Sequence, residues 1–353
     1  MEQTQRNDRL AMLAEPLLAW YDKNKRILPW RENTDPYRVW VSEIMLQQTR
    51  VEAAKEHYIR FIRELPTVGS LAACAEEKLL KLWEGLGYYS RAKNMQKTAR
   101  VVAAQGGFPT EAEELKKLPG IGDYTAGAIA SISFGKPAPA VDGNVVRVLS
   151  RVLGDAENQE ILRKRYAEEL APAYPRERCG DFTQSLMELG ALVCVPAAPR
   201  CLLCPLCSLC ETRSDALPAK RTKPEKKESE MTIFVFFDEE GLWLCRRESG
   251  VLAGMTQFYN TEGTLDTKQA SDLLCARGLT DFSLKKGKEH KHVFTHLIWH
   301  MRAFPVYTRE DVGALPAFSS LRFYTYAQAE REVSLPSAFR WCVALADVRQ
   351  TKN

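Results

Sequence analysis

Residues 115–131, LKKLPGIGDYTAGAIAS, decide the fold more than any other stretch of the chain. The run LPGIG lies between two segments in which apolar residues recur at the three- and four-residue spacing of a helix. Glycines let the backbone turn tightly and leave N–H groups bare, and together with the next helix N-terminus these groups can hold a phosphate. A glycine-containing turn is weakly specific, because it also serves as a plain connector. The stretch predicts two helices joined by a turn that can bind phosphate.

Helical patterns extend from this hairpin in both directions, from Arg9 to about Cys210. Asp35 and Pro36 suit the N-cap and the first position of a helix, which we expect to break at Gln47–Thr49. The same period predicts helices within residues 67–85, 90–105, 124–134, 144–154 and 181–194. The N-terminal two thirds of the chain is therefore expected to be all-α.

The composition changes at residues 216–230, ALPAKRTKPEKKESE, which are polar and rich in lysine. We expect a solvated interdomain linker there, with direct DNA contact as the alternative. Beyond it, MTIFVFF and LWLCRR flank a turn at Glu239–Gly241 and predict a β-hairpin. Residues 291–306 predict further strands and residues 271–279 a helix, so the C-terminal third is expected to be α+β.

The overall composition narrows the class of protein. A chain of 353 residues predicts two or three domains, and 45% hydrophobic with 27% charged residues suits a soluble globular protein. No apolar run is long enough to span a membrane, and the polar start MEQTQRNDRL lacks the apolar core of a signal peptide. We expect a cytoplasmic location. The net charge of +4 permits nucleic-acid binding without arguing for it.

Six of the ten cysteines lie between residues 179 and 210. In a reducing compartment such a run indicates metal ligation before disulfides. Cys194, Cys201, Cys204 and Cys210 form C-x6-C-x2-C-x5-C, a set of four thiolates that either zinc or a [4Fe–4S] cluster accepts. Cys207 complicates the choice of ligands, because with Cys201, Cys204 and Cys210 it also forms an even three-residue series.

Two carboxylates are candidates for catalysis. Asp142 follows the hairpin in VDGNVVRVL, where it also suits the N-cap of the next helix; both roles can hold together. Glu43 has Val39, Trp40, Leu46 and Gln47 as its helical neighbours, and this mostly apolar setting raises a carboxyl pKa and favours a proton donor. The alternative for Glu43 is an ordinary glutamate at the edge of a helix.

The stretch LPWRENTDPYRVWVSEIMLQQT, residues 28–49, resembles the MutY family of the endonuclease III superfamily, as do the hairpin and the cysteine spacing. The likeness to the superfamily covers about residues 8–212, and MutY-like features extend nearly to the C-terminus. The resemblance implies a multidomain protein: an all-α helix–hairpin–helix glycosylase core with an iron–sulfur cluster loop over residues 1–215, then an α+β MutT (Nudix)-like domain over 231–353. Within the core it implies a six-helix lobe (30–138) and a cluster lobe (1–29 with 139–215).

The resemblance also implies an activity, the excision of adenine mispaired with 8-oxoguanine or G in duplex DNA, after the base is flipped out of the helix. It makes Glu43 the acid that protonates adenine and later helps to activate water, and Asp142 the group that stabilises the sugar cation, with Tyr124 and Asn144 supporting it. Lyases of the superfamily carry a lysine where this chain has Tyr124, so a monofunctional enzyme is implied. Trp30, Arg31, Leu46 and Gln184 match adenine-pocket positions, although Trp30 could equally be a core aromatic.

The remaining implied contacts are with DNA and the cofactor. A [4Fe–4S] cluster is implied on Cys194, Cys201, Cys204 and Cys210, leaving Cys207 spare. Gln48, Thr49, Leu86 and Tyr88 match residues that probe the opposite strand, and Leu118, Gly120 and Gly122 belong to the phosphate-binding hairpin. Phe294, Thr295 and His296 stand where the family has a Phe-Ser-His loop for 8-oxoguanine, with threonine keeping the hydroxyl.

Alternatives remain at this stage. The chain could be an endonuclease III-like lyase or thymine-mismatch glycosylase, or a catalytically silent DNA-binding protein. A nucleotide pyrophosphohydrolase is disfavoured because residues 262–282 lack the glutamate-rich box of active MutT enzymes. The spacing of His290, His292, His296 and His300 fits one face of a strand, solvated or facing DNA, with a metal site as the minor alternative. We expect a monomer whose partner is mispaired duplex DNA.

Overall fold

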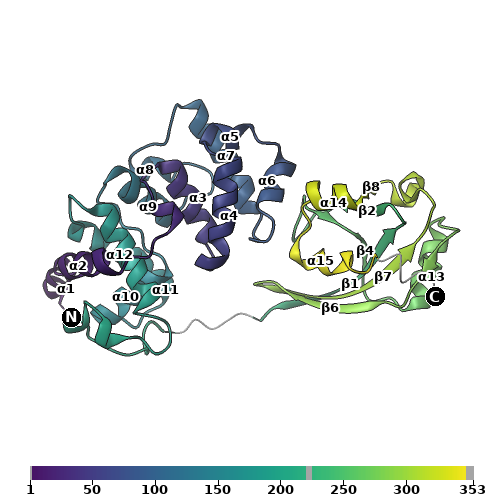
Figure 1. Cartoon of the computed structure of the whole chain (residues 1–353). Helices are drawn as coiled ribbons and strands as arrows, with labels where there is room; N and C mark the ends of the chain where they lie inside the picture. Colours follow the sequence, from purple (N-terminus) through teal and green to yellow (C-terminus); the bar gives the residue numbers. More distant parts are fainter. Residues whose placement is uncertain (1, 220–224, 347–353) are drawn as a thin grey trace. The chain divides into compact units, whose positions relative to one another are not determined.

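The computed structural model describes residues 2–219 and 225–346. The chain forms two compact units (Figure 1): the first combines Met1–Cys74 with Ser90–Thr222, and the second combines Ala75–Tyr89 with Lys223–Asn353. Residues 220–224 of the expected linker and 347–353 of the expected C-terminal domain lie outside the described residues. None of the helices in the described ranges is long and apolar enough to span a membrane.

The first unit is helical, which confirms the all-α expectation. Its elements are α1 (Gln3–Ala11), α2 (Ala14–Asn24), η1 (Pro29–Arg31), α3 (Pro36–Leu46), α4 (Val51–Glu64), α5 (Val68–Ala73), α7 (Ser90–Ala104), α8 (Ala112–Leu115), α9 (Asp123–Phe134), α10 (Gly143–Leu153), α11 (Gln159–Leu170), η2 (Ala171–Ala173), α12 (Cys179–Leu192), η3 (Cys201–Leu203) and η4 (Cys207–Leu209). Asp35 caps α3, since its carboxylate accepts from the Arg38 N–H at 2.9 Å, and the predicted break is confirmed between α3 and α4. There Gln48 adopts a left-handed φ of 60°.

Helix α12 organises the core of this unit. It packs against α2, α9 and α10, while α3 packs on α9. Phe182, Leu186 and Leu189 of α12 are almost completely buried with Leu149 of α10. This packing brings together α3, α9, α12 and the start of α10, which come from distant parts of the sequence.

Residues 67–85 were expected to be helical, and the structure divides this segment into two helices. It contains α5 and, after a break, α6 (Glu76–Leu82). Cys74 and Ala75 between them have extended backbone, with ψ near 140°. Each helix packs within a different unit, α5 on α7 and α6 on α14 (Tyr326–Glu332), and these separate packing demands explain the break.

The second unit is a mixed sheet with helices. Its strands are β1 (Lys227–Phe237), β2 (Gly241–Arg246), β3 (Thr256–Gln257), β4 (Tyr259–Glu262), β5 (Ser283–Leu284), β6 (Lys288–Val293), β7 (Leu297–Tyr307) and β8 (Arg322–Thr325); its other elements are α6, α13 (Thr267–Ala276), η5 (Val312–Ala314), η6 (Pro316–Phe318), α14 and α15 (Ser337–Val343). The main path through the sheet is β3-β2-β1-β7-β5. β1 and β2 form the predicted antiparallel hairpin, with the Asp238 carboxylate accepting from the Gly241 N–H at 2.8 Å.

Strand β1 lies at the centre of the sheet and pairs in parallel with β7 along its whole length. Its alternate side chains enter two separate cores: Ile233 and Val235 join one with Phe339 of α15, and Phe234 and Phe236 join the other with Leu274 of α13. The strand begins at Lys227, inside the expected linker. Backbone pairing with β7 extends the strand over these polar residues, although their side chains are exposed.

The expectation that four histidines share one face of a strand is wrong. His290 and His292 lie on β6, His296 lies in the turn, and His300 lies on β7. The chain reverses at this turn, where the Phe294 N–H donates to the Leu297 carbonyl at 2.8 Å, so that the even spacing spans two antiparallel strands.

Candidate active site

A cavity of about 740 Å³ opens in the helical unit, and both candidate carboxylates, Glu43 and Asp142, line it. This volume suits a small organic ligand such as a nucleoside. Glu43 comes from α3 and Asp142 from the residue before α10. Every residue expected from the sequence to act in catalysis or to bind adenine lines the same cavity: Glu43, Asp142, Tyr124, Asn144, Trp30, Arg31, Leu46 and Gln184.

Glu43 is buried and carries a perturbed carboxyl group. Its Oε2 accepts a short hydrogen bond from the Tyr124 hydroxyl. Burial is the main cause that raises the pKa of Glu43 to about 7; the nearby Asp142 carboxylate raises it too, while the Tyr124 hydrogen bond and the Arg31 charge lower it. A carboxyl group with this pKa exchanges its proton near neutral pH, as a general acid must.

Asp142 caps α10 and also faces the cavity. Its Oδ1 accepts from the Val145 N–H at 2.7 Å, and its Oδ2 accepts from the Asn144 amide at 2.8 Å. Burial raises the pKa of Asp142 above its ordinary value, although these two hydrogen bonds oppose the shift. This capping role fixes the Asp142 carboxylate at the N-terminus of α10, where it also forms part of the cavity wall.

The walls of the cavity combine apolar and charged groups. Trp30 is buried and packs edge-on against Tyr58, with ring centroids 5.4 Å apart, so it is both a core aromatic and a lining residue. Arg31 donates from Nη2 to Glu188 Oε2 at 2.9 Å.

Glu188 and Arg26 also line the cavity, although neither was predicted from the sequence. Glu188 on α12 is 1% exposed. It forms a bidentate ion pair with Arg26 at 2.8 and 2.9 Å and a further one with Arg31. Burial raises the pKa of Glu188, but the hydrogen bonds from the two guanidinium groups outweigh this effect and lower the pKa to about 2. The sequence feature that could have revealed Glu188 is that it is the only charged residue in the mostly apolar stretch LMELGAL.

The glycine hairpin has the expected form. Gly120 has a left-handed φ of +77°, and the Ile121 N–H donates back to the Leu118 carbonyl at 3.1 Å. Gly122 is the N-cap of α9 and lines the cavity beside Tyr124. An anion at this helix N-terminus would therefore lie next to the candidate catalytic groups.

The structure divides the expected DNA-contact residues between the two units. Gln48 and Thr49 line the cavity of the helical unit. Leu86 and Tyr88 belong to the segment that groups with the sheet unit, together with the turn residues Phe294, Thr295 and His296. Within that unit the Tyr88 hydroxyl lies 2.5 Å from the Thr295 hydroxyl, and Tyr88 adopts a left-handed φ of 47°.

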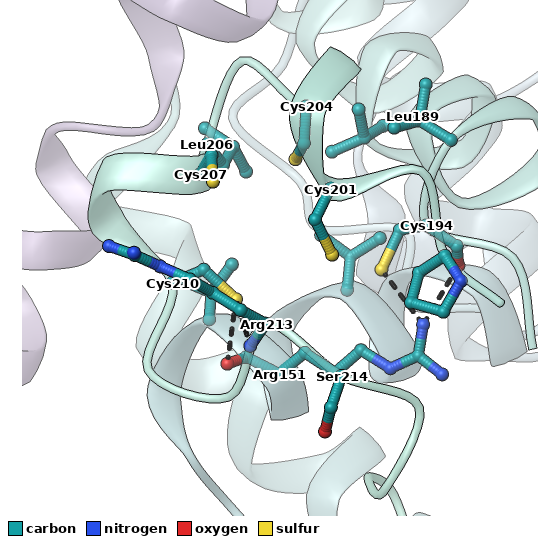
Figure 2. Close-up of a pocket in the computed structure, with 14 residues that line it drawn as sticks. Arg151, Leu189, Cys194, Cys201, Cys204, Leu206, Cys207, Cys210, Arg213 and Ser214 are labelled. Atoms are coloured by element: carbon teal, nitrogen blue, oxygen red, sulfur yellow. Dashed lines mark hydrogen bonds between the residues drawn. The ribbon is translucent and has the colours of Figure 1, made fainter.

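Five cysteines surround one hollow at the end of α10 (Figure 2). They are Cys194, Cys201, Cys204, Cys207 and Cys210. Among the residues that the structure describes, no three His, Cys, Asp or Glu side chains are grouped as they would be around one metal ion. The thiols thus share a cavity without converging on a single point.

Two arginines of α10 tie the cysteine loop to the helix. Arg151 is 2% exposed; it donates to the Cys194 sulfur at 3.3 Å and to loop carbonyls, including that of Val195 at 2.8 Å. Arg147 donates from Nε to the Cys194 carbonyl and from Nη2 to the Asn144 side chain, both at 2.8 Å. Since Asn144 in turn donates to Asp142, one chain of hydrogen bonds joins the cysteine loop to the cavity.

Comparison with known proteins agrees with this architecture. Residues 41–173 match the HhH-GPD superfamily base excision DNA repair protein family. A solved structure of a thermostable thymine-DNA glycosylase superposes with a TM-score of 0.54 at 29% identity, over 59% of this chain and 97% of that one. The helical unit, its hairpin and its cavity thus define a protein of the HhH-GPD superfamily.

Sequence relatives identify the family within this superfamily. The adenine DNA glycosylase of Buchnera aphidicola subsp. Schizaphis graminum is 35% identical over 308 residues, which cover 82% of this chain and 86% of that protein. The chain belongs to the adenine DNA glycosylase family. The human adenine DNA glycosylase is 46% identical over 202 residues, but the match covers only 36% of its length, so the chain spans little more than a third of that relative.

Proposed function

We propose that this protein is a monofunctional DNA glycosylase that flips adenine out of mispairs with 8-oxoguanine or G and hydrolyses its N-glycosidic bond. The observation that carries the proposal is the pairing of Glu43 and Asp142 across one cavity that has the size of a nucleoside site. Family membership supports adenine as the base. Duplex DNA is the partner, because the adenine must leave the stacked helix to reach carboxylates in a cavity.

The two carboxylates take different roles in bond cleavage. Glu43, with a pKa of about 7, donates a proton to the adenine ring and makes it a better leaving group. Asp142 in its ionised form stabilises the positive charge that develops on the sugar, as in glycoside hydrolysis. Asn144 and the Val145 N–H hold the Asp142 carboxylate in place. Glu43, deprotonated by the first step, then accepts a proton from the attacking water.

Tyr124 supports Glu43 and excludes a lyase mechanism at its position. Its hydroxyl donates to Glu43, and burial raises its pKa well above the ordinary value for tyrosine. A lyase would need an amine there to form a Schiff base with the sugar. The product is therefore an intact abasic strand with free adenine.

The cysteine loop fits a [4Fe–4S] cluster on Cys194, Cys201, Cys204 and Cys210, with Cys207 spare. Four thiolates on a single zinc ion would each lie about 2.3 Å from the same point, whereas each cysteine of a cubane cluster binds a different iron atom. The gathering of these thiols around one hollow and the resemblance of their spacing to the family's cluster loop support the cluster. The buried Arg151 guanidinium, held by loop carbonyls, would be balanced by the negative charge of a thiolate-bound cluster. Such a group would order the loop and take no part in hydrolysis.

We assign the recognition of 8-oxoguanine to the sheet unit. In this role it is a MutT-like domain without hydrolase activity. The turn residues Phe294, Thr295 and His296 are the proposed contacts. Their support is the resemblance of this turn to the Phe-Ser-His loop of the family and the bond between Thr295 and Tyr88. Gln48, Thr49, Leu86 and Tyr88 are proposed to contact the strand that faces the adenine.

One duplex assay tests the proposal. The same strand is offered with A opposite 8-oxoguanine, A opposite G, A opposite T, and with T opposite G. We expect free adenine from the first two duplexes only, and loss of release by a factor of about 10² to 10⁴ in Glu43→Gln. Thymine release from the T:G duplex would identify a thymine-mismatch glycosylase instead, and strand scission without alkali would identify a lyase. DNA binding without base release would leave only a binding protein.

A further inference from the structure

Glu188 is the most deeply buried charge on the cavity wall, and its role is not explained by the chemistry above. Its side chain is 1% exposed, and both of its oxygens are engaged by arginines. Oε1 accepts from Nε and the backbone N–H of Arg26, at 2.8 and 3.0 Å, and Oε2 accepts from Arg26 Nη2 and Arg31 Nη2, both at 2.9 Å. One carboxylate thus fixes two guanidinium groups from the loop between α2 and α3.

Arg31 is the member of this group that can affect catalysis. It lines the cavity with Glu43, and its charge acts on the Glu43 carboxyl. The two side chains form no ion pair, because Arg31 Nη2 is directed to Glu188 and Nη1 donates to the Arg26 carbonyl at 3.2 Å. A guanidinium that paired with Glu43 would stabilise the carboxylate and remove the proton that the acid must carry.

We propose that Glu188 is a positioning residue that holds the Arg31 guanidinium away from Glu43 and so keeps Glu43 protonated at neutral pH. The inference rests on the proposed function, since it assigns Glu188 a role in the same reaction. Without the Glu188 charge, Arg31 loses its buried partner; the carboxylates left on the cavity wall are Glu43, Asp123 and Asp142, and of these Glu43 is the one on which the Arg31 charge already acts. Arg31 then pairs with one of these, because a buried guanidinium without a counter-ion is costly.

The charged and titratable groups around Glu43 come from several elements. Tyr124 on α9, Asp142 before α10 and Arg31 in η1 act on it directly. The other such groups on the cavity wall are Arg26, Asp123, Arg163 and Glu188. Of the cations, Arg31 is the one whose charge acts on Glu43. A change in the partner of Arg31 is therefore the expected route from Glu188 to the acid.

The test is the pH dependence of single-turnover adenine release by Glu188→Gln in the full-length protein. The wild-type rate should fall above a midpoint near pH 7, where Glu43 loses its proton. An opposite charge moved within about 4 to 6 Å lowers a carboxyl pKa by about 1 to 3 units, so the midpoint in Glu188→Gln should fall by at least about one pH unit. The rate at pH 8 should then drop about tenfold or more, while the rate at pH 5 stays within a few-fold of wild type.

Three further variants separate positioning from loss of stability. Glu169→Gln is the matched control, because Glu169 also forms a buried ion pair, with Arg6 Nη2 at 2.7 Å, but does not line the cavity. It should keep the wild-type midpoint. The double variant Arg31→Gln with Glu188→Gln should have the same pH midpoint as Arg31→Gln alone. Glu188→Gln acts by releasing the Arg31 charge, and that charge is absent from both proteins.

The pKa of Glu43 can also be read without turnover, from carboxyl-carbon NMR of protein labelled in its glutamates. The Glu43 signal is the one absent from Glu43→Gln. A lower pKa of Glu43 in Glu188→Gln supports the inference. An unchanged pKa, an unchanged midpoint, or a shift that persists without Arg31 overturns it. Failure of the wild-type protein to release adenine would contradict the proposed function instead, and the NMR titration would still decide the role of Glu188.

Discussion

Glu43 is buried and Asp142 is half-buried, and burial raises the pKa of both carboxyl groups, but their hydrogen-bond partners differ. Glu43 accepts one side-chain hydrogen bond, from Tyr124, and burial raises its pKa to about 7. Asp142 accepts hydrogen bonds from the Val145 backbone and the Asn144 amide, which stabilise its anion against the effect of burial. The greater number of hydrogen-bond donors to Asp142 supports the proposed roles, with Glu43 as the proton donor and Asp142 as the anion.

The raised pKa of Glu43 has a cost in stability that a substitution should reveal. The folded-state pKa of about 7 lies above the value of 4.5 for the unfolded chain, so folding favours the protonated form. The stability contribution is intact below about pH 4.5 and is lost as pH rises through 7. Replacement by glutamine removes this loss, so Glu43→Gln should be more stable than wild type by up to about 3 kcal/mol at pH 8.

Thermal melts of the two proteins at pH 5 and pH 8 check this prediction. The melting temperature of Glu43→Gln should exceed that of the wild type mainly at pH 8, with a much smaller difference at pH 5. Glu177→Gln, at an exposed position, is the control and should follow the wild type at both values. An equal difference at the two pH values would mean that Glu43 does not titrate as described.

Single residues were partly predictable from the sequence. Apolar neighbours on the helix made Glu43 a candidate, and the glycine hairpin upstream made Asp142 one, but the resemblance to the MutY family was needed to prefer catalysis over an ordinary glutamate and a helix cap. Glu188 and Arg26 are 162 residues apart, and nothing in the local pattern connects them. Their ion pair exists only because α12 packs against α2, which is a property of the folded core.

At the scale of the element, the start of α10 combines a structural and a chemical role in Asp142. The two roles can be separated, because asparagine caps a helix about as well as aspartate does but carries no charge. Asp142→Asn should therefore keep the stability of the wild type and lose most of its adenine release. Asp142→Ala should lose about 1 kcal/mol in addition, the usual cost of removing a cap. Urea unfolding and single-turnover rates measure the two effects; substantial activity in Asp142→Asn would show that the charge is dispensable.

The hairpin before α9 offers a second prediction at this scale. A Cβ on Gly120 would meet the Asn94 Cβ at 2.8 Å and would require a left-handed φ of +77°. A Cβ on Gly122 would meet nothing within 4 Å, and its φ is −95°. Gly120→Ala should therefore destabilise the protein by about 1 to 2 kcal/mol and weaken DNA binding, because left-handed backbone is unfavourable for residues with a side chain. Gly122→Ala should lose less stability, because its cost is only that alanine is a poorer N-cap than glycine; an equal loss in both variants would contradict the account.

Elements with strong periodicity were predictable, and their interruptions less so. The helices that begin at Pro36 and Ser90 and the β1–β2 hairpin agree with their patterns, because local spacing and turn residues determine them. The break at Cys74 between α5 and α6 has no glycine or proline to mark it. The turn at residues 294–296 was equally hard to predict, because the even spacing of the histidines continues through it.

At the scale of the whole molecule, the proposed function gives the two units separate tasks. The helical unit carries the carboxylates and the cysteine loop, and the sheet unit carries the turn 294–296. The parallel pairing of β1 with β7 joins segments some 70 residues apart. The sequence could predict both strands but not this pairing, because it depends on non-local hydrogen bonds between strands that several elements separate.

The division of tasks predicts how a change in the turn affects specificity. Phe294 packs edge-on against Trp299, with ring centroids 4.8 Å apart, and keeps part of its surface accessible. Phe294→Ala should lower the preference for 8-oxoguanine over G opposite adenine by about tenfold, the loss of roughly 1.4 kcal/mol of contact energy. The rate on A:G should stay near the wild-type value. Competition between the two duplexes measures the preference; an equal loss on both would place Phe294 in the fold rather than in recognition.

The central claim is that Glu43 and Asp142 face the same extruded adenosine, and a structure of Glu43→Gln bound to a duplex with A opposite 8-oxoguanine tests it most directly. The account predicts an intact adenosine within the cavity, its base against residue 43 and its sugar against Asp142. An adenine still stacked in the duplex, or extruded to a site that one of the two side chains does not reach, would contradict it.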